Sequence, residues 1–276
     1  MKPAFNILPE PFNQDTLKLL IEAGNYGISF TWFTRYPDSI EGILVYNLDQ
    51  VLTPTEWLSA LNEIYREQPL LQKTCSSVCF CVNFPDSMLV PGEYYNQATA
   101  KEMLISNFQT GPEYEIRTDV LKEQKIFNVY GIRKELFEFF QHHHPNLKIS
   151  HSSSLELQNI PEDTSLTCII YHNSFKVFAH HQDKFLYCGS FGYSKPVDTA
   201  YYLLKICDTY GLKPDQVPLR LSGMIDEYSI LYNEMYKYFM NVSFIPAREG
   251  VNLHDRIRFY PSHFFSHQTF LITCAS

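Results

Sequence analysis

Apolar and polar residues follow one order of predicted elements that occurs twice along the chain. In each copy, short apolar runs predict three strands, which are followed by a helix with one apolar face and by a further strand. The first copy comprises Leu17–Glu22, Ile28–Phe33, Ile40–Tyr46, the helix Pro54–Glu67 and Ser77–Asn83. The second comprises Thr167–Tyr171, Phe175–His180, Phe185–Phe191, the helix Pro196–Tyr210, Pro218–Leu221 and a last helix, Asp226–Phe239. This repetition predicts an internal duplication that builds two similar lobes with a cleft between them.

Local signals support these elements. Residues 28–33 alternate between apolar and polar side chains, which is typical of a strand with one buried face. Thr53 followed by Pro54 is a helix start, because threonine caps the first turn and proline fits the first helical position. Gly211 follows the second helix and predicts its end.

The repeat predicts an N-terminal lobe over residues 1–160 and a C-terminal lobe over 161–276. The first lobe carries an insertion near residues 84–125, in which we expect a loop, a helix at Gln97–Asn107 and the start of a hairpin. The polar segment Ser152–Thr164 is the candidate linker between the lobes. In the tail, the apolar stretch Gln268–Thr273 predicts one more strand.

Size and charge exclude several classes of protein. The chain has 276 residues, enough for two domains, and 45% of them are hydrophobic, which is typical of a globular protein. The net charge is −8 and no basic block occurs, which argues against nucleic acid as a partner. The N-terminus lacks the pattern of an export signal, and no window has the roughly 20 apolar residues of a membrane span. We therefore predict a cytoplasmic protein with no transmembrane segment; the oligomeric state is left open.

The seven cysteines are scattered and contain no CxxC pair. Most lie inside apolar runs, where a free cysteine packs as a small hydrophobic residue. Reduced, buried thiols are the favoured interpretation, with a disulfide framework or a zinc site as the alternatives.

The order of elements resembles the actin-like ATPase superfamily, which includes actin, sugar kinases and heat-shock chaperones. Within the second copy, the stretches 185–193, 196–204 and 211–219 look like an uncharacterised bacterial family with this fold, which in turn resembles pilus-assembly relatives of actin. The resemblance implies an α/β fold, the duplicated actin-like (ribonuclease H-like) ATPase domain with two lobes and a central cleft. It implies no activity.

The resemblance also indicates where ATP and magnesium would bind. Actin-like ATPases use an Asp-x-Gly hairpin in each lobe to hold phosphate and magnesium, and glycines at a strand end that let the backbone approach adenosine. The first hairpin here contains Glu22 and Gly24, the second (Tyr171–Ser174) has neither acid nor glycine, and the strand end keeps Gly223 alone. Glu22, Gly24 and Gly223 are therefore the candidate cofactor-binding residues.

Each candidate has a structural alternative. Glu22 either positions a magnesium ion or is a solvated carboxylate at a strand end. Gly223 either lies near a nucleotide base or forms an ordinary strand-to-helix turn. Asp226 is interpreted as a helix cap and not as a catalytic base.

The remaining clusters give weaker signals. The run His142–His144 has the wrong spacing for metal ligands on one helix face, and its place at a helix C-terminus is favourable for histidine. The serines after His151 lack the Gly-x-Ser-x-Gly pattern of a nucleophile. Tyrosines 228, 232, 236 and 238 indicate either helix packing or an interaction patch.

The sequence thus predicts no catalytic residue and no metal site. The leading hypothesis is a bacterial pseudoenzyme, a scaffold or partner-binding module whose nucleotide cleft has decayed, and a protein partner is expected. The alternative is a weakly hydrolysing ATPase in which Glu22 holds the magnesium ion.

Overall fold

The structure, a computed structural model, describes residues 1–160 and 163–274. The chain forms two compact units. Unit 1 comprises Met1–Gln158, Asn252–Ile257 and Leu271–Ser276, and unit 2 comprises Asn159–Val251 and Arg258–Phe270. The sequence predicted two contiguous lobes, whereas two segments of the tail belong to unit 1.

The larger sheet lies in unit 1 and has the order β1-β4-β3-β2-β5-β9, with β15 also paired to β4. Its strands are β1 (Phe5–Ile7), β2 (Lys18–Gly24), β3 (Gly27–Thr34), β4 (Ser39–Asn47), β5 (Ser77–Asn83), β9 (Lys148–His151) and β15 (Asn252–Leu253). The β2–β3 and β3–β4 pairs are antiparallel, whereas β2, β5 and β9 run parallel. The carboxyl ends of three parallel strands therefore meet at one edge of this sheet.

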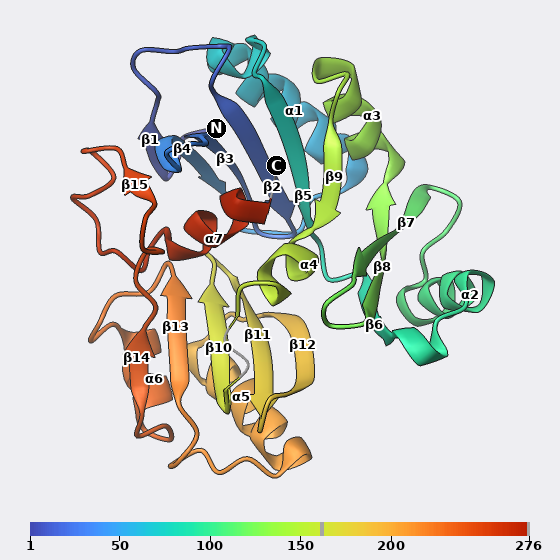
Figure 1. Cartoon of the computed structure of the whole chain (residues 1–276), viewed down its shortest axis with the longest axis vertical. Coiled ribbons are helices and arrows are strands. Elements are labelled where there is room, and N and C mark those ends of the chain that lie inside the picture. The colour runs from blue at the N-terminus through green and yellow to red at the C-terminus, as the bar shows by residue number, and fades with distance from the viewer. Residues whose placement is uncertain (161–162, 275–276) are drawn as a thin grey trace. The chain divides into compact units, whose positions relative to one another are not determined.

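The helices α1 (Pro54–Glu67) and α3 (Lys134–His143) lie beside each other in unit 1 (Figure 1). Helix α1 begins where the sequence predicts it, because the Thr53 and Glu56 side chains bond each other's backbone N–H in a capping box. Its apolar face, with Trp57 and Leu61, packs in one core with Trp32 of β3. A short 3-10 helix, Pro69–Gln72, follows α1.

The insertion forms a small sheet of its own in unit 1, with the order β6-β8-β7. Its elements are β6 (Ser87–Pro91), a 3-10 turn (Gly92–Tyr94), α2 (Gln97–Phe108), β7 (Tyr114–Leu121) and β8 (Ile126–Arg133). Helix α2 covers one face of this sheet through Ala100 and Leu104, which pack on Val129 (Figure 1). The predicted helix at Gln97–Asn107 is confirmed and is one residue longer.

The segment predicted as a linker is not one over its first half. Residues Ser152–Leu157 form the helix α4, and all six of its residues are buried. The prediction was wrong because serines are common in loops, whereas here buried partners satisfy their hydroxyl groups.

Unit 2 contains the sheet β12-β11-β10-β13-β14. Its elements are β10 (Ser165–Ile170), β11 (Ser174–His181), β12 (Lys184–Gly192), α5 (Pro196–Tyr210), β13 (Leu219–Gly223), α6 (Ile230–Tyr236) and β14 (Val242–Phe244). Residues of both helices, such as Leu203 and Met235, pack in one core with the strands. The order β12-β11-β10-β13 repeats the order β4-β3-β2-β5 of unit 1, and within each of these two sets of four strands only the last pair is parallel. The common origin of the two halves stays a prediction.

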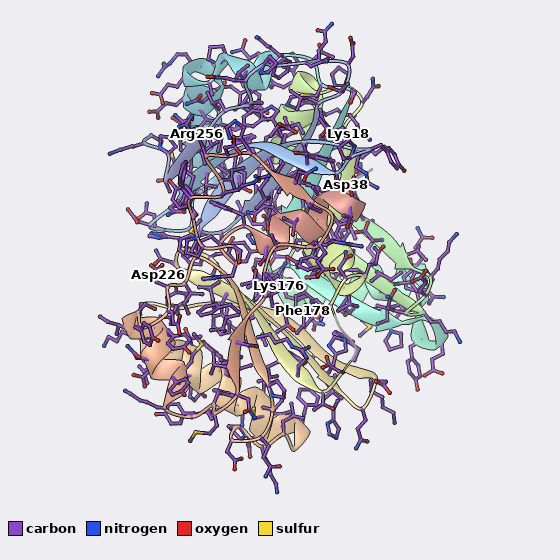
Figure 2. The ribbon with its side chains drawn as sticks, turned by 60° about the vertical axis from the view of Figure 1, so that its left-hand side comes forward. Lys18, Asp38, Lys176, Phe178, Asp226 and Arg256 are labelled. Atoms are coloured by element: carbon purple, nitrogen blue, oxygen red, sulfur yellow. The ribbon has the colours of Figure 1, made fainter. Side chains whose placement is uncertain are left out.

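Two predictions for the last third of the chain are wrong: the start of one helix, and the kind of element in the tail. Helix α6 begins at Ile230, because the Ser229 side chain accepts the cap hydrogen bond from the Tyr232 N–H, and Asp226 lies in the preceding loop (Figure 2). The tail forms the helix α7 (Ser266–Cys274) in place of a strand. Its last carbonyls, at Ile272 and Thr273, accept hydrogen bonds from Arg35, both at 2.9 Å.

Over residues 1–160 and 163–274, no helix combines the length and the apolar character needed to cross a membrane.

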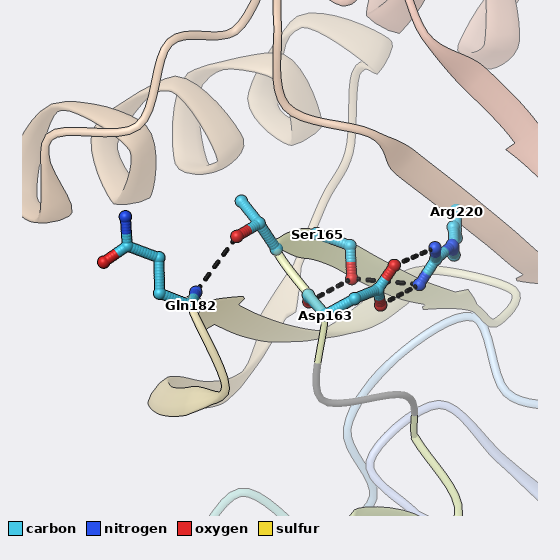
Figure 3. A network of polar contacts seen from close by, with 5 residues as sticks. Asp163, Ser165, Gln182 and Arg220 are labelled. Carbon is cyan, nitrogen blue, oxygen red and sulfur yellow. Dashed lines mark hydrogen bonds and ion pairs between the residues drawn. The ribbon is translucent and has the colours of Figure 1, made fainter.

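A bidentate ion pair fixes the residues at the start of unit 2 to the neighbouring strand (Figure 3). The Arg220 guanidinium on β13 donates to both carboxylate oxygens of Asp163, at 2.6 and 2.5 Å, and to the Ser165 hydroxyl at 3.2 Å. The hydrogen bond from Arg220 holds the pKa of the Asp163 carboxyl below its usual value. This contact ties the residues before β10 to the neighbouring strand β13.

We expect the Arg220→Met variant to destabilise unit 2 by about 0.5–1 kcal/mol at pH 7, a small effect because the Asp163 side chain is half-exposed. Since the pKa of Asp163 is lowered on folding, this contribution is present above about pH 4 and is lost as the pH falls further. Urea unfolding at pH 7 and pH 3 measures both quantities. The matched control is Lys205→Met, which removes a largely exposed pair with Asp208 at 3.8 Å and is expected to leave the stability unchanged. Equal losses in the two variants would contradict the prediction.

Candidate functional site

The first predicted hairpin places Glu22 at the edge where the parallel strands of unit 1 end. Glu22 lies on β2 and is only 5% exposed. Its carboxylate accepts a hydrogen bond of 2.8 Å from the side-chain amide of Asn83, the last residue of β5. The side-chain amide oxygen of Asn83 (Oδ1) in turn accepts a hydrogen bond of 2.9 Å from the Ser152 hydroxyl, in the first turn of α4. The carboxylate is therefore part of a buried chain of hydrogen bonds and not a solvated strand end.

His151 extends this arrangement at the end of β9. Its Nδ1 accepts a hydrogen bond from the Ser153 N–H at 3.1 Å, and its Nε2 lies 3.0 Å from the Phe84 carbonyl. These partners require a neutral ring that carries its proton on Nε2. The imidazole thus caps α4 in the way that a serine or an asparagine usually does.

Asp119 of β7 completes the group. Its carboxylate accepts hydrogen bonds from the His151 N–H at 2.8 Å and from the Tyr130 hydroxyl at 3.0 Å. Burial raises the pKa of Asp119, and these hydrogen bonds act in the opposite direction. We call Glu22, Asn83, Asp119, His151 and Ser152 the α4 polar cluster.

The packing of two neighbouring strands explains why residue 24 is a glycine. It faces Asn83 in the parallel register of β2 and β5. A Cβ atom on residue 24 would lie 2.5 Å from the Asn83 carbonyl oxygen, far inside van der Waals contact. Glycine is thus required for the two strands to approach each other here.

Gly223 ends β13 in unit 2 with a φ of +90°, a conformation that favours glycine. A Cβ atom at this position would lie 2.2 Å from the Ile170 carbonyl oxygen on the neighbouring strand. The Gly223 N–H donates to the His263 carbonyl at 2.8 Å, and the N–H of Met224 donates to the Ile170 carbonyl at 2.8 Å. Gly223 therefore forms a sharp, fully bonded turn against β10.

The second predicted hairpin is closed by a tyrosine. The Tyr171 N–H donates to the Ser174 carbonyl at 2.8 Å across the turn. The Tyr193 hydroxyl lies within hydrogen-bond distance of the Tyr171 and His172 carbonyls, at 3.1 and 2.9 Å. The neighbouring carbonyls of this turn therefore share one internal donor.

The structure distributes the three predicted cofactor-binding residues over both units, with Glu22 and Gly24 in unit 1 and Gly223 in unit 2. It joins Glu22 to Asn83 and, through Asn83, to Ser152, two residues that the sequence pattern did not single out as partners. The sequence does contain a signal for both residues, namely their places at the carboxyl ends of strands. Asn83 is the polar residue that ends an apolar strand, and Ser152 directly follows the end of β9.

The His142–His144 run makes separate contacts. The Tyr65 hydroxyl lies 2.9 Å from His144 Nε2, and His143 Nδ1 lies 2.9 Å from the Phe139 carbonyl. In the part of the chain that the structure describes, no three His, Cys, Asp or Glu side chains lie together as metal ligands would.

Of the tyrosines in the α6 region, one takes part in internal packing and others lie on the surface, as an interaction patch would require. Tyr232 is buried and stacks on Phe244, with ring centroids 5.6 Å apart. Tyr228 and Tyr236 are exposed.

Solved structures with the same architecture show which fold the chain has. A protein from Bacteroides thetaiotaomicron VPI-5482, described as having an actin-like ATPase fold and unknown function, is 17% identical, with a TM-score of 0.75 over 94% of this chain and 96% of the other. A chain of the PilM–PilN type IV pilus biogenesis complex is 13% identical, with a TM-score of 0.58 over 95% of this chain and 99% of that chain. The chain therefore has the actin-like ATPase fold, as the resemblance predicted.

The family follows from the sequence itself. Residues 9–242 match the family described as "Protein of unknown function (DUF3822)", and the chain belongs to this family. No protein with a curated description matches the sequence.

Proposed function

We propose that this chain is a non-catalytic, partner-binding member of the actin-like class, in which the nucleotide-binding positions have become structural. The observation that carries the proposal is the engagement of the Glu22 carboxylate with the Asn83 amide, which the Ser152 hydroxyl extends into α4. An acid that positions magnesium has to present its oxygens to the ion and its water ligands. Here the carboxylate is buried and is joined through Asn83 to the helix α4.

The two candidate glycines support the same proposal. Actin-like ATPases use glycine where the backbone must approach the nucleotide, but Gly24 and Gly223 each accommodate a neighbouring strand of the same sheet. Their presence is thus explained by internal packing, with no need for a ligand.

A protein partner in the bacterial cytoplasm fits this proposal. PilM, which has the same fold, occurs in a complex with PilN. A fold that hosts many functions can serve as a rigid platform for a second protein once its own chemistry is lost.

We expect millimolar Mg-ATP to leave the melting temperature of the protein unchanged. A nucleotide present at about 100 times its Kd would add about 2.7 kcal/mol and raise the melting temperature by roughly 5 °C or more. Differential scanning calorimetry with and without Mg-ATP, Mg-ADP and Mg-GTP measures this shift.

Two variants of Glu22 separate the proposal from the ATPase alternative. Glu22→Gln keeps an oxygen that accepts from Asn83 but removes the negative charge, whereas Glu22→Ala removes both. We expect Glu22→Ala to lose about 1–3 kcal/mol, since the buried Asn83 amide then loses this acceptor, and Glu22→Gln, which keeps the acceptor, to lose less. A wild-type shift with Mg-ATP that Glu22→Gln abolishes would overturn the proposal and assign magnesium to Glu22.

A further inference from the structure

The outer edge of β12 differs from the equivalent edge in unit 1. Strand β4 has the same place in its sheet as β12 and is paired along its outer side by β1 and β15. In the sheet of unit 2, β12 is the last strand, and no strand among the described residues pairs with its outer side. The same fold thus closes this edge in one unit and leaves it open in the other.

From Tyr187 onward, the β12 edge also lacks the charge, proline and bulge that protect exposed strands. It is nine residues long, and each residue from Phe185 to Phe191 is partly exposed. Its only charged residue is Lys184, at the first position, and it contains no proline. The register shift between Ala179 and His180 leaves Leu186 of β12 as an extra residue, so that a bulge lies near the start of β12 and the register from Tyr187 onward is regular. Natural proteins usually protect such an edge with charge, proline or a covering strand.

The direction of the main-chain groups follows from one hydrogen bond. The Tyr193 N–H donates to the Asn173 carbonyl at 3.0 Å, which continues the ladder between β11 and β12. In an antiparallel pair, every second residue turns its N–H and C=O toward the partner strand. Gly189 and Phe191 therefore face β11, whereas Ser190 and Gly192 turn their main-chain groups to the outer edge.

From these features we propose that β12 pairs antiparallel with β12 of a second copy of this chain, about a two-fold axis at Ser190. This register follows from the sequence of the strand. With Ser190 opposite its own copy, Gly189 lies opposite Phe191 of the second copy, and Tyr187 lies opposite Tyr193. An aromatic ring beside a cross-strand glycine covers the exposed backbone of that glycine, and aromatic cross-strand pairs stabilise sheets.

The aromatic side of the strand suits this arrangement. Phe191 stacks on Tyr202 of α5 with ring centroids 4.3 Å apart, and Tyr187 lies 6.3 Å from Phe191 in a parallel orientation. These half-buried rings form a continuous strip beside the open edge, and pairing two strips removes apolar surface from water. No charged residue occurs from 185 to 194, so the two-fold brings no like charges together along the strand.

Proline at residue 190 tests the pairing with little effect on the fold of one chain. Since the Ser190 N–H faces outward, Ser190→Pro removes a hydrogen bond to the second copy and none to β11. We expect the wild-type protein to have the mass of two chains in multi-angle light scattering at micromolar concentration. We expect Ser190→Pro to weaken dimerisation at least about tenfold, because a two-fold axis loses each contact twice. Ser190→Thr, which keeps the N–H, is the matched control and is expected to stay dimeric.

Cross-linking tests the register without relying on a folded proline variant. Directly opposed residues of a hydrogen-bonded antiparallel pair have Cα atoms about 5.5 Å apart, which a disulfide can span. In a Cys188→Ser background, we expect Ser190→Cys to form a covalent dimer under a mild oxidant. The control is Ser243→Cys, which places a cysteine on β14 at the opposite edge of the sheet and is expected to stay uncross-linked.

Three results would overturn the inference: a single-chain mass at every concentration, a dimer that Ser190→Pro leaves intact, or cross-linking at residue 243 in place of 190. The inference is independent of the proposed function, because nucleotide binding and strand pairing are measured on different residues.

Discussion

The Gly223→Ala variant is expected to lose about 3 kcal/mol or more of the unfolding free energy of unit 2. The new Cβ atom would lie 2.2 Å from the Ile170 carbonyl oxygen, which is fixed in the sheet by its hydrogen bond to the Met224 N–H. A left-handed φ of +90° adds strain for any residue with a Cβ. Because the backbone fixes the place of the Cβ atom and the oxygen belongs to the backbone of β10, no side-chain rearrangement relieves the overlap. Urea unfolding followed by far-UV circular dichroism measures the loss.

Gly211 is the matched control for Gly223. It ends α5 with a φ of +68°, but no atom lies within 4 Å of the place of its Cβ. Gly211→Ala therefore carries the backbone strain without the overlap and is expected to cost about 1 kcal/mol. Equal effects at the two positions would show that conformation alone, and not the contact with β10, requires glycine at residue 223.

Unit 1 is expected to become less stable between pH 6.5 and pH 4 because of one histidine. His144 follows α3 and is 6% exposed, and burial lowers its pKa to about 4, with the neighbouring His143 acting in the same direction. The helix C-terminus favours a charged imidazole, but burial beside Tyr65 dominates. An ordinary histidine pKa is about 6.5, so the unfolded chain binds the proton first as the pH falls. The contribution of the neutral His144 side chain to the unfolding free energy is therefore fully present above pH 6.5, and about 3 kcal/mol of it is lost by pH 4.

Both tryptophans, Trp32 and Trp57, are buried in unit 1, so that their fluorescence reports its unfolding. Between pH 7 and pH 5, we expect the wild type to lose about 2 kcal/mol more than His144→Gln, which keeps a polar partner for Tyr65 but does not titrate. The control is His142→Gln, at an exposed position in the last turn of α3, which should retain the wild-type dependence on pH. Parallel pH profiles for the wild type and His144→Gln would contradict the prediction.

Local signals in the sequence predicted the elements whose ends are fixed locally. Helices α1 and α5 have the predicted bounds, because a Pro at the first helical position and, in α5, a terminal glycine define their ends. The start of α6 and the tail were mispredicted because two cap residues compete near 226–229, and because a short apolar run such as residues 268–273 has no clear period. Burial of α7 in the fold then favoured the helix.

The candidate site was less predictable than the fold. The positions of Glu22 and Gly24 at the end of β2 follow from the strand pattern. Their contacts with Asn83 depend on the parallel pairing of β2 with β5, which are more than 50 residues apart in the sequence. The serines of α4 could not be distinguished from a linker, because the groups that bond their hydroxyls come from distant segments such as Asn83 and Asn128.

The cysteines of the two sheets have a practical consequence for measuring how each unit opens. Cys79 lies on β5 in unit 1, and Cys168 lies on β10 in unit 2; both are free and buried. Burial raises the pKa of Cys79 to about 12 and also raises that of Cys168, so that neither thiol reacts at neutral pH while its strand is in place. Their rates of alkylation therefore report separately the opening free energies of the two units. Each sheet thus contains a buried native thiol that can serve as a chemical probe, and the order in which Cys79 and Cys168 themselves react gives the order in which the two halves unfold.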